Sequence, residues 1–262
     1  MAEKSLSTLI KSLQRGFGRA GRIAVQDITR SATATTAVFF LRAFYFCKVL
    51  GRLRTLEADN AFPVTIDHNL LMLWKKLDRM TLLIKPLSVL EQVAKNSRVL
   101  VIGPRNEWDL FLLSRAGFQF DQCTGLDLIS YSPKIILGDM HAMPFSDGEF
   151  DVVLCGWTLS YSAHPALACA EISRVCRSGG VIGLSVEFFV GSEDDEKLAT
   201  GGYTIQDSRL DERVNSTDQL LEFFPDHGSV FFDHDSPLKR TVPRDPLPSN
   251  CAVLFENYSI TQ

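Results

Sequence analysis

The chain has 262 residues and a net charge of −4, with 45% apolar and 22% charged residues. This composition is that of a folded globular protein and excludes a disordered or fibrous chain, and the length suits one α/β domain with an appendage. Six cysteines without a C-x-x-C pair or a nearby histidine cluster argue against a metal site and indicate reduced thiols in a cytosolic protein.

Residues 1–60 predict a basic helical arm. They carry ten basic and four acidic residues, a net charge of +6, whereas residues 61–262 carry 17 basic and 27 acidic residues, a net charge of −10. The apolar run 37–50 contains Arg42 and Lys48 and is too short to span a bilayer. We therefore expect a cytoplasmic protein without a transmembrane helix.

Two interpretations of the arm are open. An apolar, aromatic helix with many cations can lie in a membrane interface, which would place the protein peripherally at the inner membrane face. The same apolar side chains can instead pack over an acceptor pocket as a lid. The lid is favoured, because Arg42 and Lys48 interrupt the apolar run.

Beyond the arm, apolar residues at three- and four-residue steps predict a helix over 65–85 that Pro86 ends. From Arg98 onward short apolar runs alternate with helical segments, which is typical of βαβ units and a parallel sheet. The predicted strands are 98–103, 122–127, 134–138, 150–156, 181–186, 229–233 and 251–257, and the predicted helices are 107–116, 165–176 and 217–224. Residues 61–262 are thus expected to form one α/β domain, with 191–215 as an acidic, polar insertion and 237–248 as a proline-rich loop.

A buried strand that ends in glycine and leads into a helix is typical of a nucleotide site. Gly103 ends such a strand, so the backbone can approach a ligand and the helix N-terminus favours an anionic group. The next strand ends at Asp127, where a carboxylate can accept hydrogen bonds from both hydroxyls of a ribose. The alternative for Asp127 is a turn-forming aspartate at a strand end.

The segment 138–153, GDMHAMPFSDGEFDVV, resembles the GDAxxLPFxDxxFDVV run of class I S-adenosylmethionine-dependent methyltransferases. The strand end Gly156–Trp157, the helical AEISRV and the turn SGG follow in register and are similar to the family's E..RVLKPGG segment. The resemblance covers residues 95–190 and, in outline, 216–257. It implies a Rossmann-like, seven-stranded, mostly parallel sheet whose last two strands form an antiparallel hairpin.

The resemblance also implies S-adenosyl-L-methionine as the cofactor and assigns its binding residues. Gly103 falls on the methionyl side, Asp127 at the ribose and Asp139 at the adenine amino group, with the Met140 backbone beside the ring. Gly156 and Trp157 fall near the sulfonium and the acceptor.

Three departures from the family pattern concern the cofactor turn. Val101 replaces the usual acidic residue of the first strand, Arg105 and Glu107 replace the second and third glycines, and residues 128–133 leave no room for the usual helix. The guanidinium of Arg105 could pair with the methionyl carboxylate of the cofactor. Decay of the glycines in a non-binding relative is the alternative.

Transfer to a hydroxyl acceptor is helped by a base, because the hydroxyl must lose its proton. Tyr161 stands where many family members carry a histidine, and His164 follows it as the preferred base. The expected function is O-methylation of a small molecule or saccharide. The alternative is a non-catalytic methyltransferase-like scaffold or regulator. A nucleic-acid acceptor is not expected, because the body is acidic and lacks the Asn/Asp-Pro-Pro-Tyr/Phe signature.

Overall fold

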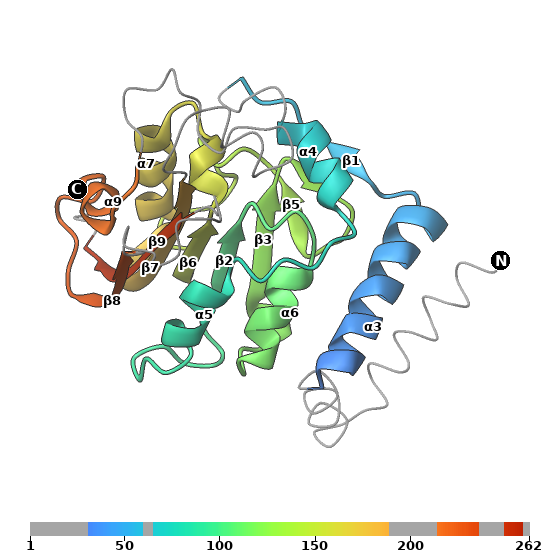
Figure 1. Cartoon of the computed structure of the whole chain (residues 1–262), viewed down its shortest axis with the longest axis horizontal. Coiled ribbons are helices and arrows are strands. Elements are labelled where there is room, and N and C mark those ends of the chain that lie inside the picture. Colours follow the sequence, from blue (N-terminus) through green and yellow to red (C-terminus); the bar gives the residue numbers. More distant parts are fainter. Residues whose placement is uncertain (1–30, 60–64, 189–213, 236–248, 259–262) are drawn as a thin grey trace, which may run out of the picture.

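The computed structural model of the chain describes residues 31–59, 65–188, 214–235 and 249–258 (Figure 1). Its centre is a seven-stranded sheet in the order β5-β3-β2-β6-β7-β9-β8. The strands are β2 (Val99–Ile102), β3 (Cys123–Asp127), β5 (Ile135–Leu137), β6 (Phe150–Gly156), β7 (Cys176–Phe188), β8 (Val230–Asp235) and β9 (Ser249–Asn257). β9 is antiparallel to β7 and β8 and the remaining pairs are parallel, which confirms the predicted sheet and its C-terminal antiparallel pair.

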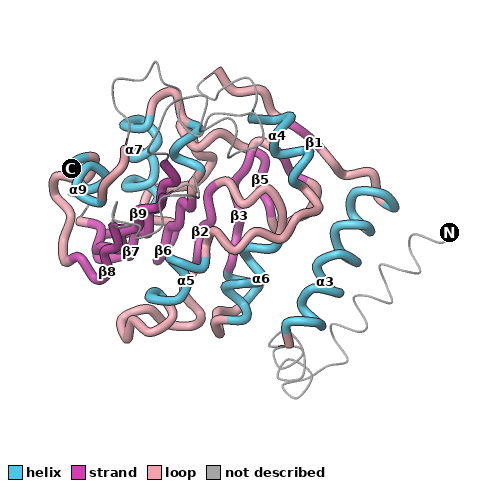
Figure 2. The backbone as a smooth tube through the Cα atoms, viewed as in Figure 1, coloured by secondary structure: helices cyan, strands magenta, loops and turns pink. Residues whose placement is uncertain are grey.

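Helices cover both faces of this sheet (Figure 2). α5 (Thr81–Leu87) and α6 (Trp108–Arg115) pack on one face, and α7 (Pro165–Val175) and α9 (Thr217–Glu222) pack on the other. The side chains of β2 alternate between the two cores, with Val99 and Val101 in the first and Leu100 and Ile102 in the second. All four are buried, as expected for a parallel strand covered on both faces.

The helix predicted over 65–85 is two helices, α4 (Thr65–Met72) and α5, so this prediction was wrong. The apolar stripe serves two separate cores: Leu73 packs beside Ile129, whereas Met80 and Leu83 pack under the sheet. A single straight helix cannot reach both cores, and the chain turns between them. Pro86 lies inside the last turn of α5 and does not end it. β7 is also longer than the predicted strand 181–186.

The described part of the arm is α3 (Ala32–Phe44), the π-turn η1 (Tyr45–Val49) and the short strand β1 (Arg54–Thr55). The Phe39 ring contacts Trp108 and Phe111 of α6, with centroid separations of 5.6 and 6.5 Å. Within the described ranges, every helix is too short or too polar to cross a bilayer. Arm residues 1–30, insertion residues 191–213 and the loop 237–248 lie outside the described residues.

The arm packs on the segment between β3 and β5, where the family resemblance implies a helix. Residues 128–134, all described, contain no helix but the short strand β4 (Ile129–Ser130), which pairs antiparallel with β1. Ala43 of α3 and Leu73 after α4 pack with Ile129 and Tyr131 in one buried cluster. Residues 31–59 therefore share a core with the domain that was predicted to begin at residue 61.

Candidate functional site

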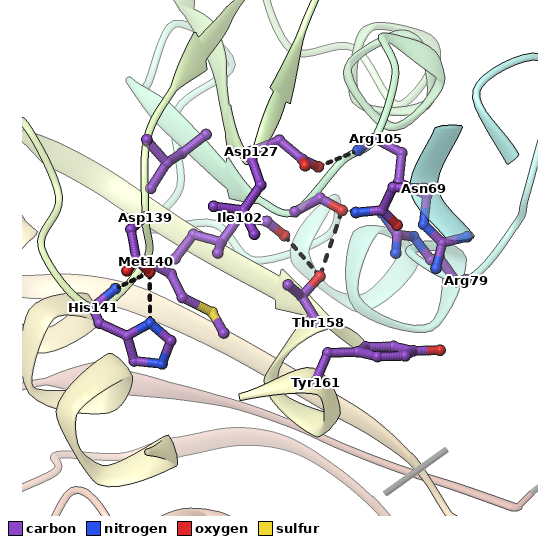
Figure 3. A pocket seen from close by; sticks show the side chains of 14 residues that line it. Asn69, Arg79, Ile102, Arg105, Asp127, Asp139, Met140, His141, Thr158 and Tyr161 are labelled. Carbon is purple, nitrogen blue, oxygen red and sulfur yellow. Dashed lines mark hydrogen bonds and ion pairs between the residues drawn. The ribbon is translucent and has the colours of Figure 1, made fainter. Parts of the chain in front are cut away.

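A cavity opens at the carboxyl ends of β2 and β3, beside the turns that follow β5 and β6 (Figure 3). Ligands of open parallel sheets bind at this edge. Its lining includes six predicted site residues: Gly103, Arg105, Asp127, Asp139, Met140 and Tyr161. It also includes residues that no motif indicated, among them Asn69 of α4, Arg79 before α5 and Thr158 after β6.

Gly103 has a φ of +66°, and a side chain there would collide with a neighbouring turn. An added Cβ would lie 2.2 Å from Oγ1 of Thr158, whose hydroxyl donates to the Ile102 carbonyl at 3.2 Å. The glycine is therefore required by the close approach of the turn after β6 to the end of β2.

Arg105 holds a left-handed backbone with φ +58°, which costs a residue with a side chain about 1–2 kcal/mol. Its backbone N–H donates to Oδ2 of Asp127 at 2.6 Å, and the backbone N–H of Ile129 donates to Oδ1 at 3.1 Å. The carboxylate is thus fixed at both oxygens, and each keeps a lone pair for a further donor. Burial raises the pKa of Asp127, and these two hydrogen bonds oppose that rise.

Two buried arginines stand at one end of the cavity, where Figure 3 shows Arg79, Arg105 and Asn69 together. The guanidinium of Arg79 donates to the Gly103 carbonyl and to Oδ2 of Asp109 at 3.1 Å. Among the described residues, no carboxylate forms an ion pair with the Arg105 guanidinium. Burial lowers the pKa of Arg105, and the charge of Arg79 lowers it further. This end of the cavity therefore suits an anionic group.

The opposite end carries a chain of three polar side chains. The Asp139 carboxylate accepts from the His141 backbone N–H at 3.0 Å, and its Oδ1 lies 2.5 Å from Nδ1 of the same residue. Nε2 of His141 lies 2.7 Å from the Ser162 hydroxyl. Both contacts that the carboxylate makes with described residues use Oδ1, so Oδ2 remains for a ligand.

The loop that begins with Asp139 is clamped by α7. Glu171 accepts from the Met143 backbone N–H at 2.7 Å, and Arg174 donates to the Phe145 carbonyl at 2.8 Å. The hydrogen bond from Arg174 lowers the pKa of Glu171. These contacts give a physical reason for the glutamate and arginine of the AEISRV segment, which position the loop without touching the cavity.

Gly156 and Trp157 lie at the end of β6 but do not line this cavity. A Cβ on Gly156 would lie 2.1 Å from Sδ of Met80, so a side chain there would displace the buried Met80. Trp157, with φ +60°, lines a second cavity of about 690 Å³. Arg79 lines both cavities, and the second has a largely apolar wall that includes Leu77, Leu82, Pro86 and Phe232.

The two residues predicted to act in catalysis are separated. Tyr161 lines the first cavity and its ring stacks on His68 of α4, with centroids 6.2 Å apart. Burial lowers the pKa of His68, and the charges of Arg105 and Arg79 add to this effect. His164 is exposed before α7 and lines neither cavity, so the geometry does not support it as the base.

The described part of the arm does not form the predicted lid over either cavity. No residue of 31–59 lines either cavity, and α4 is the helix that covers the first cavity through Asn69. The described residues contain no group of three histidine, cysteine, aspartate or glutamate side chains that could hold a metal ion.

Comparison with known proteins gives one family match. Residues 106–184 match a family model described as a methyltransferase domain. No curated protein matches the chain. This family match includes the ends of β3 and β6 and the loop of Asp139.

Solved structures give remote likenesses. A chain of the complex between the Haloferax volcanii Trm112 methyltransferase activator and the putative methyltransferase is 16% identical, with 74% of this chain and 95% of that chain covered and a TM-score of 0.49. The [4+2]-cyclase SpnF is 14% identical over 85% and 96%, with a TM-score of 0.47. Geranyl diphosphate methyltransferase in complex with S-adenosylmethionine is 14% identical over 76% and 93%, with a TM-score of 0.44.

Proposed function

We propose that this chain, which carries a class I S-adenosylmethionine-dependent methyltransferase domain, methylates a hydroxyl group of a small molecule or saccharide. One observation carries the proposal: a cation and two carboxylates, Arg105, Asp127 and Asp139, line a single cavity at consecutive turns of the sheet edge. S-adenosylmethionine has an anionic methionyl end, a ribose diol and an adenine amino group, and these three side chains complement them in kind.

The contacts of each side chain support this assignment. Asp127 is held at both oxygens by backbone N–H groups and keeps lone pairs for the ribose hydroxyls. Oδ2 of Asp139 is left to accept from the adenine amino group, because His141 uses Oδ1. The guanidinium of Arg105 is buried without a carboxylate partner among the described residues. The methionyl carboxylate of the cofactor would form an ion pair with it.

The bound cofactor supplies an activated methyl group on a sulfonium. What remains for the protein is to align the acceptor and to exclude water. The second cavity is suited to the acceptor, because Trp157 stands at the end of β6 and Arg79 joins the two cavities. Its lining combines an apolar wall with the polar side chains of His234 and Asn250, which fits a molecule with an apolar face and hydroxyl groups.

The proton of the acceptor hydroxyl needs a route away from the reacting oxygen. Tyr161 is placed in the cavity lining, and the imidazole of His68 stacks on it. Burial lowers the pKa of His68, which favours the neutral form of its imidazole. We assign this role to the hydroxyl of Tyr161, which would accept the acceptor's proton as it passes its own proton to solvent, in place of His164.

The test is transfer of a labelled methyl group from S-adenosylmethionine to a panel of hydroxylated and amino-bearing small molecules and saccharides. We expect label on a hydroxyl oxygen, and Tyr161→Phe should lower kcat while cofactor affinity is unchanged. Tyr258→Phe, at an exposed tyrosine, is the matched control. Methylation of nitrogen alone, or a full kcat in Tyr161→Phe, would contradict the assignment.

A further inference from the structure

The outer face of α3 is an apolar stripe that faces solvent. Phe40 is 39% exposed, Leu41 68% and Phe44 56%, at the three- and four-residue spacing of one helical face. Val49 and Leu53 continue the exposure beyond the helix, at 58% and 39%. We call these five residues the outer stripe.

The outer stripe is a concentration of apolar side chains and not a scatter of single ones. Of twelve large hydrophobic side chains exposed among the described residues, six lie between residues 40 and 56. A scattered exposed hydrophobic residue needs no explanation, but a contiguous group marks an interaction surface.

The inner face of α3 is anchored to the domain, and this fixes the orientation of the helix with the outer stripe toward solvent. Phe39 is fully buried against α6, and Arg42 reaches inward to the buried carboxylate of Glu107, with two contacts of 2.7 Å. Arg42 therefore belongs to the inner face. Of the two cations in the apolar run, Arg42 thus does not interrupt the outer stripe, whereas Lys48 is exposed beside Val49.

Exposed cations lie among and just beyond the last members of the outer stripe. Lys48, Arg52 and Arg54 are all exposed at its C-terminal end, where Glu57 is the nearest acidic residue in the sequence. Residues 1–60 have a net charge of +6 although the rest of the chain has −10. An acidic protein with a basic segment around an exposed apolar stripe is complementary to a surface that is both apolar and anionic.

We propose that the outer stripe docks the protein on an anionic lipid surface. The apolar side chains of Phe40, Leu41 and Phe44 enter the boundary between head groups and acyl chains, and Lys48 and Arg54 meet the head groups. α3 lies in the interface and does not cross it. This docking is independent of the proposed methyl transfer.

The test is co-sedimentation of the full chain with phosphatidylcholine vesicles, with and without phosphatidylglycerol. We expect binding only to the anionic vesicles, and weaker binding as salt is raised. The combined Phe40→Ser, Leu41→Ser and Phe44→Ser variant should lose at least about tenfold in vesicle partitioning. Lys48→Gln and Arg54→Gln should each lower it by about fivefold.

Matched controls separate the stripe from general hydrophobicity. Leu71 and Val89 are 77% and 76% exposed elsewhere on the surface, so Leu71→Ser and Val89→Ser should leave vesicle binding unchanged. Thermal unfolding and cofactor titration report whether each variant is folded.

Three outcomes would overturn the proposal. Equal vesicle binding by the triple serine variant would remove the stripe from the contact. Vesicle binding that appears only after deletion of residues 1–30 would mean that this segment, and not a lipid surface, covers the outer stripe in the full chain. If the parent chain is a dimer that does not bind vesicles and the triple serine variant is a monomer, the outer stripe contacts a second copy of the chain.

Discussion

Arg42 of α3 and Glu107, the residue before α6, form a two-pronged ion pair. Nε of Arg42 lies 2.7 Å from Oε2 of Glu107, and Nη2 lies 2.7 Å from Oε1. Burial would lower the pKa of Arg42, but the hydrogen bond and charge of Glu107 outweigh it and raise that pKa. Glu107 stands where the family pattern has a glycine, so this departure serves the attachment of the arm.

Arg42→Ala should lower the free energy of unfolding by about 3 kcal/mol, because it leaves the fully buried Glu107 carboxylate without its cation. Urea unfolding measures this loss. The double variant Arg42→Ala, Glu107→Gln should recover part of it, since no unpaired charge remains. If the single variant is as stable as the parent, α3 is not held by this pair.

Asp127→Ala should weaken cofactor binding by about 1–3 kcal/mol, the loss of hydrogen bonds to a charged acceptor. Calorimetric titration with S-adenosylhomocysteine measures it. Asp121→Ala, at an exposed aspartate near the start of β3, is the matched control and should bind normally. Unchanged affinity in Asp127→Ala would remove this residue from the cofactor site.

Arg105→Gly should change stability and affinity in opposite directions. Glycine relieves the left-handed backbone and removes a buried cation, so the free energy of unfolding should rise by about 1 kcal/mol. Cofactor affinity should fall at least tenfold, about the loss of one charge-assisted contact to a carboxylate. Tighter binding by the glycine variant would mean that the arginine obstructs the turn.

Glu171→Gln tests the clamp on the loop of Asp139 through its pH dependence. The pKa of Glu171 is lowered in the folded state, so its stabilisation is present above the unfolded value of about 4.3 and is lost as pH falls below it. The stability difference between parent and variant should therefore be constant from neutral pH to about pH 5 and should shrink below about pH 4. Urea unfolding across this pH range measures it, and a difference that persists in acid would contradict the clamp.

Much of the sheet could be predicted from sequence, because its strands are short apolar runs bounded by glycine or aspartate. β6 and the ends of β2 and β3 were located to within a residue. The break between α4 and α5 could not be read, because one apolar periodicity served two cores that only the fold separates.

Some residues of the site could also be predicted from the sequence, and others could not. Gly103, Asp127 and Asp139 carry local signals at strand ends, and the structure brings all three to one cavity. Arg79 and Asn69 precede the sheet by many residues and enter the cavity only through the packing of α4 and α5, so no local pattern marks them. His164 was chosen for its residue type and spacing, and the turn after β6 directs it to solvent.

The measurement that tests the central claim most directly is calorimetric titration of the full chain with S-adenosylmethionine and, separately, with S-adenosylhomocysteine. A cofactor cavity built on Arg105, Asp127 and Asp139 predicts saturable one-to-one binding of both, with each displacing the other. The absence of binding of either compound to a chain shown to be folded by its unfolding transition would contradict the claim. That result would make the chain a non-catalytic relative that keeps the fold.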